Sequence, residues 1–265
     1  MNKYIIGIIF IHILIIILIY IYINKKNNIE KFEDYLRFGY VINLDERTDR
    51  LDKIINKFSE LNLPLYRIPA IKHNIGWKGC GLSHMSVIKM AKQNNLPSVL
   101  ILEDDCNPTD FFENWFPIQE WLENNRSKWD IFTGGNSYYG FHPDEKNDIQ
   151  SVCKLKNDIR LYYTKLLALH FYYVNSSCYD KMIEWEEYMR THSQEWIPVD
   201  FWPDKKELVI ITSSPFIALQ DVDFSSIENT VKDLNSTYKT SEEIIASIPN
   251  EESCELSQPM EDNNP

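Results

Sequence analysis

Three consecutive carboxylates end an apolar run in VLILEDDC, which spans residues 99–106. Adjacent acids repel one another, and burial beside apolar residues adds to the cost, so such a cluster needs a cation, hydrogen bonds or open water. Oxygen ligands at positions i and i+2 on a chain leaving a strand can converge on one Mg²⁺ or Mn²⁺. On this hypothesis Glu103 and Asp105 bind the metal, Asp104 lies between them, and the cation attracts a diphosphate that the acids alone would repel.

The same triplet has a simpler interpretation as a solvated loop or a helix N-terminus, where acids interact favourably with the helix dipole. For an isolated EDD triplet this is the more common case. The position directly after VLIL favours metal binding, because ligands of open α/β sheets collect beyond the carboxyl ends of the strands.

Polar residues also follow the first predicted strand, in VINLDERTDR at residues 41–50. Asn43 could hydrogen-bond a uracil or a ribose, or satisfy the backbone at the strand end. Arg47 and Arg50 could each bind a phosphate through two N–H groups, or pair with acids such as Asp49 on the helix surface. For Arg47, surface pairing is the stronger expectation from the residues alone.

Glycines, a serine and a histidine occur together in GCGLSHM, at residues 79–85. Ser83 and His84 open a predicted helix, so Ser83 could be its N-cap and His84 a packed core residue. Glycines also let a backbone approach a ligand closely, and a helix N-terminus beside a histidine suits a phosphate. The residues leave both interpretations open.

A fourth candidate is Asp200 in IPVDFW, which lies among Trp196, Phe201 and Trp202. Aromatic surroundings raise the pKa of a carboxyl by desolvation, which suits a general base, and the rings could stack against a sugar. Alternatively Asp200 caps a helix and the aromatic residues belong to the core, because capping is a common task of Asp in loops.

The elements that must position these residues alternate between strands and helices. Segments read as strands are YVINL, LYRIPAI, SVLIL, KWDIFTGG, LALHFYYVN and LVIITSSPFIAL, whereas residues 136–148 read as a polar loop. Helical segments run from Asp49 towards Pro64, through LSHMSVIKMAKQNN, FFENWFPIQEWLENN and SCYDKMIEWEEYM. This alternation predicts an α/β domain over residues 38–232, with a mostly parallel sheet covered by helices on both faces.

The N-terminus predicts a membrane anchor. Residues from Tyr4 to Ile23 form twenty consecutive positions without a formal charge, the length that crosses a bilayer as a helix. We therefore expect a single-pass anchor within residues 1–26 and a linker over 27–37. Lysines occur on both sides of the span, so the side of the membrane stays unresolved, although the positive-inside rule leans towards a cytoplasmic C-terminal domain.

The formal net charge of -12 argues against a nucleic-acid partner. About half of it lies in residues 235–265, where we count seven Asp or Glu and one Lys, a net of -6. This segment is rich in Ser, Asn, Glu and Pro, so residues 233–265 are expected to form an acidic, disordered tail.

The five cysteines, at positions 80, 106, 153, 178 and 254, are odd in number and have no CxxC spacing. Neither a zinc site nor a disulfide framework is therefore expected. Cys80 and Cys106 are expected to be small buried fillers.

Six motifs in register resemble glycosyltransferase family 25, which includes lipooligosaccharide and collagen galactosyltransferases. They are VINLDERTDR, GCGLSHM, LILEDD, WDIFTGG, IPVDFW and PFIALQDVDFSSI, and together they extend over about residues 38–228. Where the family often shows GEIGC, this chain has GWKGC at 76–80, and residues 136–160 match nothing we can assign.

The resemblance implies a GT-A-like fold and inverting transfer of a hexose, commonly galactose, from a UDP-sugar to a hydroxyl of a glycan, lipid-linked or hydroxylated protein acceptor. Beside the resemblance, the residues themselves lead us to expect Mn²⁺ or Mg²⁺ as the cofactor, with Glu103 and Asp105 as ligands and Asp200 as the base. The residues assigned to donor binding are Asn43, Arg47, Arg50, Ser83, His84 and Asp104.

Two other hypotheses compete with this one. A catalytically inactive relative could bind a sugar nucleotide while tethered to a membrane, although the retained acidic triplet and PVD segment argue against it. A metal-dependent phosphoesterase also uses carboxylates at strand ends. Such enzymes recruit further His and Asp ligands, and the histidines of the chain are scattered with no HxxxH spacing, so this hypothesis ranks third.

Overall fold

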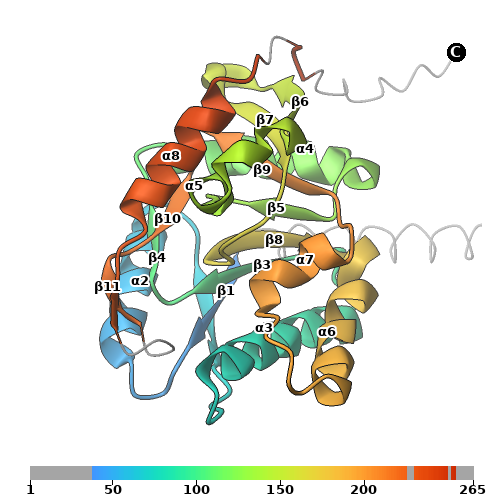
Figure 1. The fold of residues 1–265 in the computed structure, drawn as a ribbon. Coiled ribbons are helices and arrows are strands. Elements are labelled where there is room, and N and C mark those ends of the chain that lie inside the picture. The colour runs from blue at the N-terminus through green and yellow to red at the C-terminus, as the bar shows by residue number, and fades with distance from the viewer. Residues whose placement is uncertain (1–37, 226–229, 250–251, 255–265) are drawn as a thin grey trace, which may run out of the picture. The chain divides into compact units, whose positions relative to one another are not determined.

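The computed structural model describes residues 38–225, 230–249 and 252–254. Its centre is a mixed sheet of eight strands in the order β2-β1-β3-β8-β5-β9-β7-β6 (Figure 1). The strands are β1 (Gly39–Asn43), β2 (Leu65–Pro69), β3 (Ser98–Glu103), β5 (Ile131–Thr133), β6 (Gln150–Lys154), β7 (Arg160–Thr164), β8 (Phe171–Asn175) and β9 (Ile210–Ser214).

The α/β class is confirmed, but the predicted mostly parallel sheet is wrong. Strand β1 pairs in parallel with β2 and β3, and β5 with β9. Strand β8 runs antiparallel to both β3 and β5, and β7 runs antiparallel to β6 and β9. Central antiparallel strands that are buried on both faces read as continuous apolar runs, so their sequences resemble those of parallel strands.

Helices cover both faces of the sheet. The longer ones are α2 (Thr48–Glu60), α3 (Gly76–Gln93), α4 (Trp115–Asn124) and α6 (Tyr179–Thr191), and the shorter ones are α5 (Tyr138–Phe141) and α7 (Trp202–Lys205). Two small sheets pair β4 (Cys106–Pro108) with β10 (Ala218–Gln220), and β11 (Asp223–Ser225) with β12 (Thr230–Lys232).

Strand β8 shows how the sequence specifies these layers, because successive side chains point to opposite faces. Phe171 and Tyr173 meet Trp115 of α4 edge to face, with ring centroids 5.1 and 5.4 Å apart. Tyr172 and Val174 belong to the core beneath α3 and α6, which lie side by side (Figure 1). Each face therefore has its own buried core.

The predicted disordered tail is wrong for residues 235–249 and 252–254. Helix α8 (Asn235–Ala246) packs against α5 (Figure 1) and buries Tyr238 and Ile245. Those two positions are seven residues apart, so they lie on one helical face, a short stripe that the acidic composition obscured. A disulfide joins Cys153 of β6 to Cys254, so the expectation of no disulfide is also wrong.

The predicted anchor lies outside the described residues. Within the part of the chain that the structure describes, no helix has the length and apolar character needed to cross a membrane.

Candidate active site

A cavity of about 1000 Å³ opens at the carboxyl ends of β1 and β3. Strand register explains the position, because Ile42 pairs with Glu103 and both parallel strands end at this edge. Most of the predicted site residues line the cavity: Arg47, Arg50, Ser83, His84, Glu103, Asp104, Asp105 and Asp200. Asn43 lies outside the lining and is buried.

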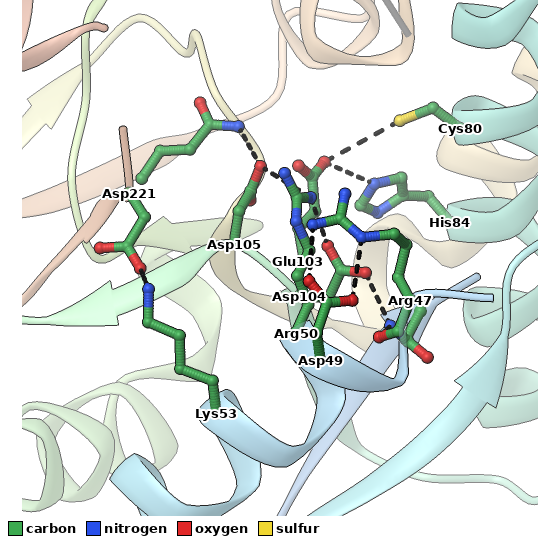
Figure 2. A network of polar contacts seen from close by, with 12 residues as sticks. Arg47, Asp49, Arg50, Lys53, Cys80, His84, Glu103, Asp104, Asp105 and Asp221 are labelled. Atoms are coloured by element: carbon green, nitrogen blue, oxygen red, sulfur yellow. Dashed lines mark hydrogen bonds and ion pairs between the residues drawn. The ribbon is translucent and has the colours of Figure 1, made fainter. Parts of the chain in front are cut away.

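Asp104 is held by residues of the first strand and helix. Asn43 Nδ2 donates to Asp104 Oδ2 at 2.8 Å. Arg50 Nη1 donates to Asp104 Oδ1 at 2.8 Å (Figure 2). The Asn43 Oδ1 atom accepts a hydrogen bond from Arg67 Nε at 3.0 Å. Asn43 Nδ2 also donates to Arg47 O at 2.9 Å, so the predicted satisfaction of the backbone at the strand end is confirmed, and both ends of the Asn43 amide are used within the protein.

Arg50 connects two members of the acidic triplet. Its Nη1 atom also lies 3.6 Å from Asp105 Oδ2, and its side chain is only 9% exposed. Burial raises the pKa of Asp104, and the hydrogen bond from Arg50 opposes that rise. Arg47 donates to both carboxylate oxygens of Asp49 at 3.0 Å, the surface pairing expected for it, while still lining the cavity.

Asp105 has one satisfied and one unsatisfied oxygen. Gln220 Nε2 donates to Oδ2 at 3.0 Å, whereas Oδ1 is buried and has no hydrogen-bond partner among the described residues. Burial, together with the charge of Glu103, raises the pKa of Asp105 to about 7. A buried carboxylate oxygen without a donor, beside a second carboxylate, is an arrangement that a bound cation would relieve.

Glu103 is oriented by helix α3. Its Oε1 atom lies 3.0 Å from His84 Nε2, and the Cys80 thiol donates to the same oxygen at 3.9 Å (Figure 2). The other ring nitrogen of His84 lies 2.8 Å from the Tyr172 hydroxyl. Burial alone would raise the pKa of Glu103, but the hydrogen bond and charge of His84 outweigh it and lower the pKa.

The predicted helix start at Ser83 is wrong, because α3 begins at Gly76. The Ser83 hydroxyl donates to Gly79 O and accepts from Ile71 N, both at 2.7 Å. A Cβ at Gly79 would lie 2.7 Å from Ile71 O, and one at Gly81 would lie 2.2 Å from the Trp185 ring. Gly79 and Gly81 therefore allow close packing of α3, and the part of its N-terminus that lines the cavity is formed by Gly76 and Trp77.

Asp200 lies in the short 3₁₀ turn Val199–Phe201 and lines the cavity. It does not cap α7, whose N-cap is Phe201. Burial and then the charge of Glu103 raise the pKa of Asp200 to about 6. Of the neighbouring rings, Trp202 is a core residue whereas Trp196 is 66% exposed at the cavity.

Comparison with protein-family models supports the resemblance seen in the sequence. Residues 74–200 match the family model described as glycosyltransferase family 25 (LPS biosynthesis protein). Over these residues the chain is similar to glycosyltransferase family 25, so the resemblance expected from the sequence motifs is confirmed. The matched segment contains GCGLSH, the acidic triplet and the PVD segment, and it ends at Asp200.

Solved structures give weaker likenesses. A glycosyltransferase involved in the glycosylation of the major capsid of PBCV-1 aligns with a TM-score of 0.44 at 9% identity, covering 77% of this chain and 98% of that one. A putative glucose-1-phosphate thymidylyltransferase from Bacillus anthracis gives 0.36 at 9% identity, with coverages of 79% and 76%. A nucleoside-diphosphate-sugar pyrophosphorylase from Vibrio cholerae RC9 gives 0.30 at 16% identity, with coverages of 66% and 70%. No curated protein matches the chain.

The cavity also contains residues that sequence reasoning did not assign. Gln220 of β10 holds Asp105, and Lys232 of β12 lines the cavity near Glu103 and Asp200, whose pKa values its charge lowers in part. His170, which precedes β8, lines the same cavity and hydrogen-bonds Ala218 O at 3.0 Å. Of these three residues, only Gln220 could have been found from the sequence, because it ends the motif strand PFIALQ.

Proposed function

We propose that this glycosyltransferase moves a hexose, with galactose as the first choice, from a UDP-sugar to a hydroxyl of a glycan, lipid-linked or hydroxylated protein acceptor, with inversion. One observation carries the proposal: Glu103, Asp105 and Asp200 all line a single cavity of about 1000 Å³. That volume is at the upper end of typical ligand sites and suits a nucleotide sugar together with part of an acceptor.

The residues fit a divalent cation, Mn²⁺ or Mg²⁺. The Asp105 Oδ1 atom, which no described residue hydrogen-bonds, and the adjacent Glu103 carboxylate offer hard oxygen ligands, which these ions prefer. When bound, the ion would neutralise charge on the diphosphate of the departing UDP. Arg50 keeps Asp104 and Asp105 in place, and Gln220 fixes the second oxygen of Asp105.

Asp200 is the proposed general base. With a pKa of about 6, its carboxylate is mostly ionised near neutral pH and retains more basicity than an exposed Asp. It would accept the proton of the acceptor hydroxyl as that oxygen attacks the sugar. Trp196, exposed at the same cavity, offers a ring face on which an acceptor sugar could stack.

We further propose that the catalytic domain resides in an oxidising compartment, tethered by the predicted single-pass anchor. The Cys153–Cys254 disulfide supports this side of the membrane, because disulfides persist outside the reducing cytosol. This proposal disagrees with the positive-inside rule, which favours a cytoplasmic C-terminal domain. The disulfide is the more direct indicator of the compartment.

A donor assay tests the proposed reaction. Purified protein is incubated with UDP-galactose or UDP-glucose, Mn²⁺ and a panel of glycan acceptors, and UDP release is measured with and without chelator. We expect chelator to abolish release, and Asp105→Asn to lower it at least about a hundredfold, because one cation ligand is lost. Asp110→Asn, a change at an exposed acid nearby, is the matched control. Release that persists unchanged in Asp105→Asn would refute metal-dependent transfer, and tight donor binding without turnover would favour the inactive-relative hypothesis.

A further inference from the structure

Three potential metal ligands of different chemistry meet at the wall of the cavity. Cys80 and His84 are four residues apart on α3, so they lie on one helical face, and Glu103 ends the neighbouring strand β3. The Cys80 Sγ, His84 Nε2 and Glu103 Oε1 atoms all lie within 4.8 Å of one another (Figure 2). We propose that this trio is a second metal site, selective for thiophilic divalent ions and for Zn²⁺ in particular.

The donor set distinguishes this site from the Glu103–Asp105 pair. Mg²⁺ and Mn²⁺ prefer oxygen ligands, whereas one thiolate and one imidazole favour Zn²⁺. Zinc bonds are about 2.0–2.3 Å long, so the ligand atoms of a tetrahedral site lie roughly 3.3–3.8 Å apart. The Glu103 oxygen already lies 3.0 Å from His84 Nε2 and 3.9 Å from Cys80 Sγ, so small side-chain rotations suffice.

The surroundings support coordination at these atoms. The Tyr172 hydroxyl, 2.8 Å from His84 Nδ1, holds the imidazole so that Nε2 faces the carboxylate, an arrangement common behind zinc-bound histidines. All three residues line the cavity, which gives the ion a route of entry and leaves a fourth coordination position for water. Binding replaces the hydrogen bonds that now join Cys80 and His84 to Glu103, and the protons of the Cys80 thiol and of His84 Nε2 both leave these atoms, the first to solvent and the second to solvent or to Nδ1, which then donates to the Tyr172 hydroxyl.

Glu103 belongs to both proposed sites, which has a consequence for activity. An ion held by Cys80 and His84 engages the carboxylate that the Glu103–Asp105 pair needs, so Zn²⁺ inhibits Mn²⁺-dependent transfer. This consequence rests on the proposed function, whereas Zn²⁺ binding itself does not.

Cobalt provides a test that does not need activity. Co²⁺ substitutes for Zn²⁺, and a cobalt–thiolate bond gives a charge-transfer absorption band in the near ultraviolet. The full chain is titrated with Co²⁺ in the absence of nucleotide, and Zn²⁺ is then added to displace it. We expect a saturable band from the wild type that Zn²⁺ removes.

Three variants make the test specific. Cys80→Ser loses the band, whereas Cys178→Ser keeps it, because Cys178 is a buried free cysteine outside the cavity lining whose hydrogen bonds to backbone carbonyls a serine can replace. Glu103→Gln weakens Co²⁺ affinity at least about tenfold and keeps the side-chain shape. Circular dichroism verifies that each variant is folded.

Either of two results would overturn the proposal: a wild-type protein without the band, or a band that survives in Cys80→Ser. Unchanged Co²⁺ affinity in Glu103→Gln would show that the Glu103 carboxylate is not a ligand of the site. If Co²⁺ binds as expected but Zn²⁺ leaves transfer unaffected, the proposed function of Glu103 fails and the zinc site stands.

Discussion

Asp105→Asn should make the metal-free domain more stable at alkaline pH. Burial and the charge of Glu103 raise the pKa of Asp105 to about 7, roughly three units above the value of an unfolded chain. A group with a raised folded-state pKa favours folding below its unfolded pKa, near 4, and that contribution is lost as the pH rises through about 7. Above that pH the folded protein therefore holds an unfavourable charge that asparagine lacks.

The magnitude follows from the shift and the burial. Three pKa units correspond to about 4 kcal/mol as an upper limit, and relaxation around a side chain that is 14% exposed reduces the expected gain to about 1–2 kcal/mol. The Gln220 amide can donate to the asparagine oxygen as it does to Asp105, so that hydrogen bond survives. The gain should be full near pH 8 and absent near pH 4.

Urea denaturation in chelator measures this difference, with Asp110→Asn as the exposed control. Unfolding is followed by tryptophan fluorescence at about pH 4 and pH 8, and the free energies of unfolding are compared. A variant that is less stable than the wild type at the higher pH would show that Asp105 is already satisfied in the free protein. The argument for a cation at Oδ1 would then lose its basis.

Three further predictions concern other residues of the domain. Asp200→Asn should lower the rate of transfer by a factor on the order of 10²–10⁴ while leaving UDP-sugar affinity within about twofold. Wild-type turnover should fall as the pH drops through about 6, because the base becomes protonated. An unchanged rate in the variant would exclude Asp200 as the base. In chemical denaturation, Asp204→Asn should raise the free energy of unfolding by about 1 kcal/mol near pH 8 and leave it unchanged near pH 4. The reason is that burial raises the pKa of Asp204 to about 6, so the stabilising contribution of the protonated form is lost above that pH. Equal effects at both pH values would contradict this cause. Cys254→Ser should lower the free energy of unfolding by about 2–5 kcal/mol in thermal or urea denaturation, because the disulfide to Cys153 closes a loop with a sequence separation of 101. A wild-type protein whose stability does not change in reductant would contradict the prediction.

The position of the acidic triplet could be predicted from sequence because it depends on a local rule. An apolar run that ends in acids places them at the carboxyl edge of a sheet, and Glu103 and Asp105 do face the cavity there. Asp200 was also predicted from a local feature, since it is a carboxylate among aromatic residues in a loop. The element types were also local features, and β1, β3, α2 and α6 form close to where the apolar periods place them.

The partners of these residues could not be predicted, since they depend on contacts distant in the sequence. Gln220 reaches Asp105 across 115 positions, and Lys232 enters the site from a small sheet with no apolar signal. The internal role of Asn43 arises because β1 and β3 lie side by side, which brings its amide to Asp104. Strand direction was likewise hidden, because burial on both faces gives parallel and antiparallel strands the same apolar appearance.

The most direct test of the central claim is the affinity for UDP-galactose with and without Mn²⁺, measured by calorimetry on the wild type and on Asp105→Asn. Our account holds that a cation at Glu103 and Asp105 binds the diphosphate. It predicts that Mn²⁺ tightens binding to the wild type at least about tenfold, or roughly 1.4 kcal/mol, and that the variant loses this gain. Equal affinity in Mn²⁺ and in chelator, or a gain that survives in Asp105→Asn, would contradict it.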